Sequence, residues 1–391
     1  MDVSNGLRTL IAKAEMSRGI IILYSAALFV LCHCPVAIAA ALSGSHLNWG
    51  NLATWETSLP DPVPPPLARV LDVARQSLDI KVQPIPQFHL AGTLNKDPAH
   101  QESDRAKQNF PQIFDLAVCA RLAPEPLRGQ CLTKASLALL AWANIYQPSG
   151  NPVDDSFFAP MLQGVDLIAS KVDANDRKKL LDWVRSFAQA GDRFYDKAAP
   201  ARGYAPKINN IRFNNFMSWR LYLRALSGEI CQDQPSLRET RSLLADFLNH
   251  TFVAGANGVL DGTTYDFVQR DSLHYHIYDL EPLVWMSLLT PSVLNQSARS
   301  RIELGLNFIK PFYTGEREHV EFQHSVSDFD FKRINEDKNN PTFQMKSWDP
   351  KEARDLFLIA RQVFPDIRSW TTNVVDERYD PSMKLLANLL N

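Results

Sequence analysis

Apolar side chains recur along most of the chain at intervals of three and four residues, the spacing that places them on one face of an α-helix. Prolines, glycines and small polar residues flank these runs, as helix start and stop signals do. The pattern predicts helices over residues 67–78, 109–121, 130–146, 155–172, 175–195, 215–226, 236–250, 278–289, 297–313, 349–364 and 381–390. Strictly alternating runs, which would predict strands, are nearly absent. The chain is therefore expected to fold as an all-α array of helical hairpins joined by short loops.

Two stretches depart from this pattern. Residues 40–108 contain clustered prolines, which remove backbone donors and fix φ. Apart from the helix at 67–78, we expect this stretch to be an extended segment that wraps a helical domain formed by residues 109–391. Residues 315–348 are charged, rich in asparagine and long for a loop in a compact domain, so they predict a lid, a binding loop or disorder.

The first 39 residues have the layout of a secretory signal peptide. A basic and polar region precedes an apolar run, and Ala37-Ile38-Ala39 supplies a small-residue cleavage site. Met16 would make a more typical start. The alternative is a membrane anchor, but the apolar run is shorter than the roughly 20 residues that a spanning helix needs. We therefore expect a periplasmic or secreted protein without stable membrane insertion after cleavage.

Export makes a disulfide possible, and three cysteines follow the signal segment. Cys119 and Cys131 form the natural pair, closing a short loop, although a pairing that involves Cys231 stays open. Removal of residues 1–39 leaves 38 basic and 41 acidic residues, from 41 and 43 in the whole chain. This slightly acidic balance argues against a nucleic-acid partner, and an anionic ligand would have to meet a local basic patch.

The densest polar cluster of the sequence lies at residues 270–278, just before an apolar helical run. It contains Arg270, His274, Tyr275, His276 and Tyr278. Arginine is a permanent cation, histidine titrates near neutrality, and tyrosine exchanges a proton when its pKa is lowered. This set suits an anionic substrate whose reaction moves a proton.

A second stretch, Lys197–Gly228, carries six basic residues and no Asp or Glu. It includes Arg220 and the pair Asn214-Asn215, which opens a predicted helix. The alternative interpretation is a solvated basic face, with Asn214 as the helix N-cap.

Other chemistries find less support in the sequence. His274 and His276 could form a metal pair, but zinc-type sites need three or four ligands, and no further ligand has convincing spacing. The sequence contains no nucleophile elbow, P-loop or dinucleotide fingerprint. We therefore expect no metal and no cofactor.

The stretch Arg270–Leu283, with its Leu-His-Tyr-His-x-Tyr-x-Leu-x-Pro-Leu order, resembles the signature of the bacterial alginate lyases. Asn214-Asn215-Phe216-Met217-Ser218-Trp219-Arg220 is similar to the Asn-Asn helix start of that family. The resemblance implies an incomplete (α/α) toroid and β-elimination on alginate or another anionic polyuronate, by a monomer.

The same resemblance implies residue roles. Asn215 and Arg270 would neutralise the uronate carboxylate, and Tyr278 would take the C5 proton and return one to the leaving oxygen. Substrate contacts are expected from Asn214, Arg220, His274 and Tyr275.

The sequence departs from the family pattern at two points. Phe216 and Trp219 occupy the positions where the family carries a histidine, and the arginine lies eight residues before Tyr278 rather than seven. We expect His276 to take the neutralising role and His274 to turn toward the core, because residues two apart on a helix point to different sides. The alternatives are a non-catalytic polyuronate-binding protein and a metal-dependent glycan hydrolase.

Overall fold

The computed structural model describes residues 44–50, 52–198, 210–254, 258–338 and 340–371, all within the compact unit Ala40–Asn391. The signal segment, the predicted helix at 381–390 and the middle of the basic stretch, with Arg202 and Lys207, lie outside these residues.

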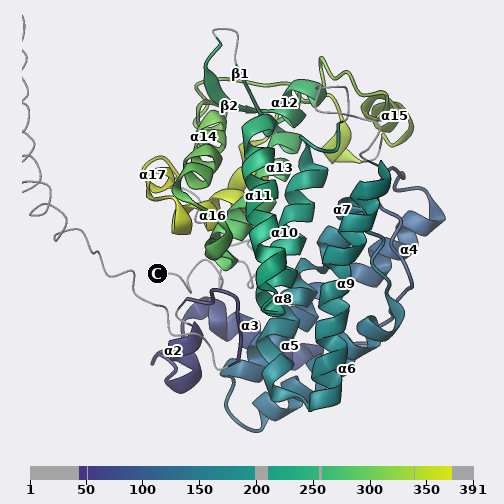
Figure 1. Ribbon diagram of the computed structural model, residues 1–391, viewed down its shortest axis with the longest axis vertical. Coiled ribbons are helices and arrows are strands. Elements are labelled where there is room, and N and C mark those ends of the chain that lie inside the picture. Colours follow the sequence, from purple (N-terminus) through teal and green to yellow (C-terminus); the bar gives the residue numbers. More distant parts are fainter. Residues whose placement is uncertain (1–43, 51, 199–209, 255–257, 339, 372–391) are drawn as a thin grey trace, which may run out of the picture. The chain divides into compact units, whose positions relative to one another are not determined.

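Long helices follow one another as hairpins, confirming the all-α prediction. The first helix of each hairpin packs against the first helix of the next, so α5, α8, α10, α13 and α16 form an inner row. The helix that follows each of them lies outside that row (Figure 1). The hairpins are α5 (Phe110–Leu122) with α6 (Leu127–Ile145), α8 (Ala159–Ile168) with α9 (Ala174–Ala198), α10 (Asn215–Ile230) with α11 (Gln234–Thr251), α13 (Leu273–Leu289) with α14 (Gln296–Tyr313), and α16 (Arg354–Val363) with α17 (Pro365–Arg368). This arrangement is an all-α toroid.

The inner row is buried on most of its circumference, because other helices pack on several of its faces. Ten successive residues of α5, from Ile113 to Leu122, are buried, and α8 and α10 are buried to a similar extent. Outer helices such as α9 are amphipathic instead. The disulfide Cys119–Cys131 joins α5 to α6, with 5.9 Å between the two Cα atoms. The preferred pairing is thus confirmed, and Cys231 is free.

The N-terminal segment is more regular than the prolines suggest. It contains α2 (Leu52–Thr57), α3 (Pro65–Gln76), the 3-10 turn Ser77–Asp79 and α4 (Pro98–Lys107). Prolines at Pro65 and Pro98 start helices, where the missing N–H costs nothing, so the expectation of a mainly extended chain was wrong. Hydrogen bonds attach the segment to the helices that follow it: Asp166 on α8 accepts from His46 N and Trp49 Nε1, and Asp154 accepts from Leu90 N.

The remaining elements are short. They are α7 (Pro152–Asp155), the antiparallel strands β1 (Phe252–Ala254) and β2 (Leu260–Thr264), α12 (Tyr265–Arg270), α15 (Asp328–Glu336) and the 3-10 turns Ser156–Phe158, Ala169–Lys171, Pro291–Val293, Pro341–Phe343 and Pro350–Ala353. Gly262, with φ +93°, lets β2 approach α14, because a Cβ there would lie 2.2 Å from Leu304 O. The segment 315–348, predicted as a loop, contains α15. The sequence pattern predicted neither α12 nor the two strands.

Candidate active site

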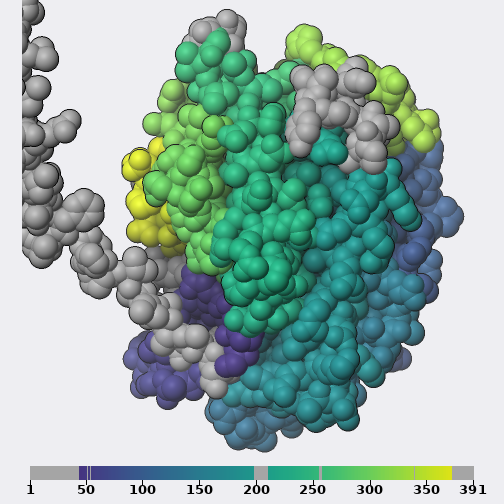
Figure 2. Space-filling view, in the orientation of Figure 1, coloured from purple at the N-terminus to yellow at the C-terminus, as the bar shows by residue number. Residues whose placement is uncertain are grey.

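A cleft of about 540 Å³ lies where the N-terminal segment meets the start of α10 and α13. The N-terminal segment contributes residues 90–107 of the lining, and α15 and the turn Pro341–Phe343 contribute the opposite rim. The two rims touch, since Lys96 pairs with Glu336 at 3.2 Å. Figure 2 shows α15, in yellow-green, beside the blue segment that contains α4. The lining residues of the cleft come from five stretches of the chain, within 90–107, 153–157, 211–216, 270–278 and 327–343.

Helix α13 starts five residues earlier than its apolar pattern predicts. Ser272 Oγ caps it by accepting from Tyr275 N at 3.2 Å, and Glu321 Oε1 accepts from Leu273 N at 3.0 Å. The polar cluster therefore occupies the first turns of the helix. His274 and Tyr278 are four residues apart and share one helical face, which lines the cleft together with Tyr275.

His276 lies on the opposite side of α13, in the core. Its side chain is fully buried, with Nε2 3.0 Å from Gly305 O and Nδ1 2.9 Å from Thr264 Oγ1. A carbonyl only accepts, so Nε2 carries the proton and the threonine hydroxyl donates to Nδ1. Burial lowers the pKa of His276 to about 4, which keeps the ring neutral. The expected neutralising role of His276 is therefore wrong.

His274 occupies the place that was expected for His276. It lines the cleft, half-buried, and its Nδ1 lies 3.5 Å from Glu352 Oε2. Glu352 also pairs with Lys346 at 3.1 Å, which fixes the carboxylate behind the imidazole. The expectation that His274 turns toward the core is also wrong. Residue 274, not residue 276, shares a helical face with Tyr278.

Arg270 lines the cleft from the end of α12. Its Nε donates to Asp330 Oδ2 at 2.5 Å and its second nitrogen pairs with Asp330 Oδ1, a bidentate arrangement. The guanidinium also lies over the ring of Tyr275, 3.8 Å from the centroid. Since Asp330 belongs to α15, the long 315–348 segment holds this arginine in place.

The two asparagines meet the cleft at the start of α10. Asn214 is the N-cap, and its Oδ1 accepts from Phe216 N at 3.2 Å. Asn215 is buried and donates from both its backbone N and its Nδ2 to Asp266 Oδ2. Phe216, at a position where the family carries a histidine, also lines the cleft.

Tyr278 is partly buried, and its ring lies 5.3 Å from that of Trp219. Burial raises the pKa of the Tyr278 phenol above its ordinary value, although a hydrogen bond with Ser156 opposes the rise. The free protein therefore holds this tyrosine protonated at neutral pH.

Arg220 does not line the cleft, contrary to its expected role in substrate binding. Its guanidinium pairs with Asp192 at 2.9 Å and lies over Tyr195, 4.2 Å from the ring centroid. Arg224 pairs with Asp192 and Glu239. Asp192 lies on α9 and Glu239 on α11, so these arginines attach α10 to both neighbouring helices.

Other residues of the cleft were missed by sequence reasoning. His100, Asp104 and Lys107 line it from α4, where Lys107 Nζ lies 2.8 Å from Asp104 and 3.9 Å from the ring centroid of Phe157. Their spacing of four and three residues puts them on one helical face, a signal that was available once the helix was recognised. Arg333 of α15 donates to Tyr275 Oη at 2.5 Å.

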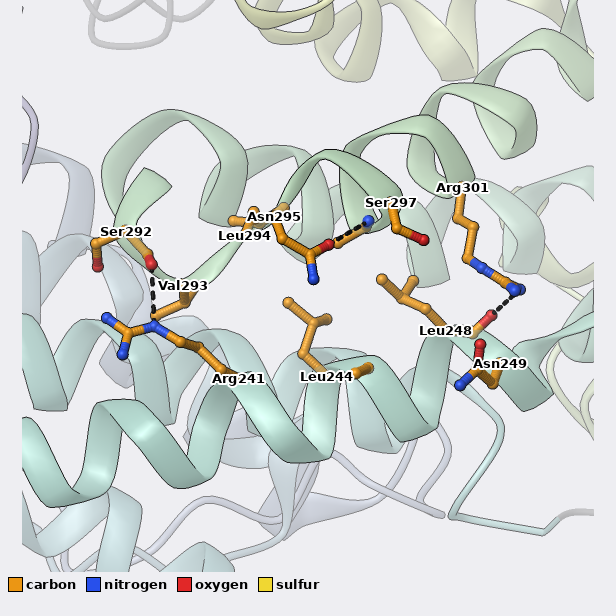
Figure 3. Close-up of a pocket in the computed structure, with 12 residues that line it drawn as sticks. Arg241, Leu244, Leu248, Asn249, Ser292, Val293, Leu294, Asn295, Ser297 and Arg301 are labelled. Carbon is orange, nitrogen blue, oxygen red and sulfur yellow. Dashed lines mark hydrogen bonds between the residues drawn. The ribbon is translucent and has the colours of Figure 1, made fainter. Parts of the chain in front are cut away.

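A smaller pocket of about 230 Å³ lies elsewhere, between α11 and α14. Arg241 and Arg301 stand at its two ends, each donating to a backbone carbonyl, and Leu244 and Leu248 form its floor (Figure 3). It contains none of the proton-transfer residues. The described residues contain no cluster of three or more metal-ligating side chains, and none of their helices is long and apolar enough to cross a membrane.

A helical toroid whose cleft is lined by tyrosine, histidine, asparagine and arginine side chains fits the class of polysaccharide lyases. The sequence profile of the alginate lyase family matches residues 43–319, and the chain belongs to that family.

Solved structures of alginate lyase A1-III share the fold. The enzyme from Sphingomonas species A1 has 16% identity and a TM-score of 0.50, covering 90% of this chain and 97% of that one. The apo form of its histidine-to-alanine variant has 17% identity, the same coverage and a TM-score of 0.50. That variant with a bound tetrasaccharide aligns with a TM-score of 0.48, at 17% identity over 90% and 96% of the two chains. No curated protein matches the chain in sequence.

Proposed function

We propose that this polysaccharide lyase is an exported monomer that cleaves alginate or a related polyuronate by β-elimination. The observation that carries the proposal is the cleft itself, which brings Asn215, Arg270, His274 and Tyr278 together although they come from three different helices. Elimination needs a proton acceptor at C5 and donors around the uronate carboxylate, and these side chains supply both.

The charge of the cleft favours an anionic chain. Lys107, Arg270 and Arg333 line it, against Asp104 as the acidic residue in the lining. Aromatic rings at Phe157, Phe329 and Phe343 give the same cleft apolar faces on which sugar rings can pack. A polymer with one carboxylate per sugar offers these cations negative partners, which a neutral glycan lacks.

We assign carboxylate neutralisation to Asn215, Arg270 and His274. The family histidine is replaced by Phe216, and His274 brings an imidazole to the cleft from the neighbouring helix. Protonated, it would offer a charged donor to the carboxylate while the C5 proton leaves. Glu352 lies behind the ring, with its Oε2 3.5 Å from Nδ1.

We assign the C5 proton transfer to Tyr278. Its phenol is protonated in the free protein, so the phenolate that removes the proton forms only in a minority of molecules near neutral pH. The cations of the cleft stabilise that phenolate. After the C4–O bond breaks, the tyrosine can return its proton to the leaving oxygen. One group would then serve both steps.

Export is proposed on two observations that agree. Residues 1–39 have the layout of a secretory signal, and Cys119 and Cys131 form a disulfide, which persists in oxidising compartments. Fractionation of the native host with an antibody to the protein tests this part, and recovery in the reduced cytoplasm would oppose it.

The test of activity is the growth of ultraviolet absorbance during incubation with mannuronate-rich, guluronate-rich and glucuronate-containing polymers. Only elimination creates the conjugated double bond, so absorbance separates a lyase from a hydrolase. Repetition after chelation tests the metal-dependent alternative. One observation favours the binding-protein alternative, namely Phe216 at the histidine position; that alternative predicts polymer binding without new unsaturated ends on any substrate.

A further inference from the structure

Helix α12 is a six-residue element between β2 and α13, and it carries two charged groups beneath the cleft. Thr264 caps it by accepting from Phe267 N at 3.2 Å, and Asp271 ends it in the left-handed conformation, with φ 44°. Asp266 and Arg270 are four residues apart and therefore share a face. The helix delivers a carboxylate toward α10 and a guanidinium toward α15.

Asp266 holds Asn215 through a single oxygen. Oδ2 accepts from the backbone N of Asn215 at 2.7 Å and from its Nδ2 at 2.8 Å, and both side chains are buried. A carboxylate only accepts, so the nitrogen of the asparagine amide, not its oxygen, must face Asp266. Nδ2 carries a second N–H, and Asn215 itself is one of the residues that line the cleft.

Burial of the Asp266 carboxylate lowers the stability of the fold. Asp266 is fully buried, and burial raises the pKa of its carboxyl to about 6, although Arg270 and the two bonds from Asn215 oppose the rise. Asp330 on α15 adds repulsion, and Asp279 faces it from α13, where burial raises the pKa of the Asp279 carboxyl well above its ordinary value. Burying this carboxylate is costly, and the charge of Arg270 and the two bonds from Asn215 offset part of that cost.

We propose that Asp266 is a positioning residue, which fixes the Asn215 amide so that its free N–H points at the uronate carboxylate. The inference rests on the proposed function, since it assigns Asn215 to carboxylate neutralisation. Asp266 itself touches no substrate; it acts through Asn215, and its loss should weaken the transition state more than the bound substrate.

A double-mutant cycle tests this coupling. Asp266→Asn keeps the size of the side chain, and we expect kcat on the preferred polyuronate to fall about 10- to 100-fold with KM within about threefold, the loss typical of residues that orient a functional group. In an Asn215→Ala background the same substitution should change kcat less than about threefold, because the group that Asp266 orients is gone.

Asp166→Asn is the matched control. Asp166 is an equally buried carboxylate that holds the N-terminal segment through Trp49 and two backbone N–H groups, away from the cleft. We expect it to lower the melting temperature while leaving kcat of the folded enzyme unchanged. If Asp266→Asn does not fold, Asp266→Glu keeps the charge beside Arg270 and displaces the oxygen, and the same cycle is run with it.

Two results would overturn the proposal: a kcat unchanged in Asp266→Asn, or an equal fall with and without Asn215. If the wild-type protein makes no unsaturated ends, the proposed function fails instead. The cycle is then measured as affinity for an oligouronate, where coupling between residues 266 and 215 supports the positioning role and its absence removes it.

Discussion

The two faces of α13 each carry a histidine, under opposite conditions. His274 and Tyr278 meet the cleft, whereas His276 and Asp279 are buried among Thr251, Thr264 and Gly305. On the first face the side chains have only partial protein contacts and remain open to a ligand. On the second, both ring nitrogens of His276 and one carboxylate oxygen of Asp279 have hydrogen-bond partners, and burial favours the neutral form of each group. Two residues along the helix correspond to a rotation of about 200°, and this rotation decides whether a histidine of α13 faces the cleft or the core.

The largest expected effect is on the cleft face. Tyr278→Phe removes one oxygen and should lower turnover about 10²- to 10⁴-fold, the usual contribution of a positioned acid–base group, while the melting temperature stays close to that of the wild type. Initial rates of absorbance increase and thermal melts measure the two effects. A variant that keeps more than a few per cent of the wild-type rate would exclude Tyr278 as the base.

The pH dependence sharpens the same assignment. A base must lose its proton to act, and burial raises the pKa of Tyr278 above that of a free phenol. The turnover rate should therefore increase with pH, by up to tenfold per pH unit while the Tyr278 phenol remains mostly protonated. A rate profile on short oligouronates checks this, and a rate that falls steadily above neutral pH contradicts it.

The histidines should respond differently to the same substitution. His274→Ala is expected to lower kcat about 10- to 100-fold with little loss of stability, because it removes a donor from the carboxylate site. His324→Ala is the matched control: His324 is exposed and bound to Asp271, outside the cleft lining. Equal rates for the two variants would remove His274 from the mechanism.

His276 should affect stability instead of rate. Its pKa is about 4 in the fold against about 6.5 unfolded, so the unfolded chain binds the extra proton. This contribution to the free energy of unfolding is complete above pH 6.5 and is lost as the pH falls to 4, an amount of about 3 kcal/mol. The difference between wild type and His276→Gln in urea unfolding should shrink over that interval. A constant difference would show that the ring is not held neutral.

How far the sequence could lead is visible on this helix. Apolar periodicity located the helices and their hairpin order, because burial of one face dominates each of them. The helical periodicity of α13 already places residues 274 and 278 on one face. The family resemblance instead directed the prediction to His276, which lies closer to Tyr278 in sequence. Arg220 was misplaced because its partner Asp192 lies on α9, a contact that composition within Lys197–Gly228 cannot reveal. The α4 residues were missed because prolines obscured a short polar helix.

The smallest expected effect separates a cation of the cleft from a cation of the helix packing. Lys107 lines the cleft, so Lys107→Ala should weaken binding of an oligouronate several-fold at low salt. That loss should shrink as salt rises, since exposed charges are screened over about 10 Å at 0.1 M ionic strength. Both cations are paired, Lys107 with Asp104 and Arg220 with Asp192, but Arg220 lies outside the cleft lining. Arg220→Ala should therefore leave affinity within about twofold while lowering stability. Calorimetric titrations at two salt concentrations compare the variants. If Arg220→Ala loses as much affinity as Lys107→Ala, with the same salt dependence, the polymer reaches the α9–α10 face and the binding surface extends beyond the cleft.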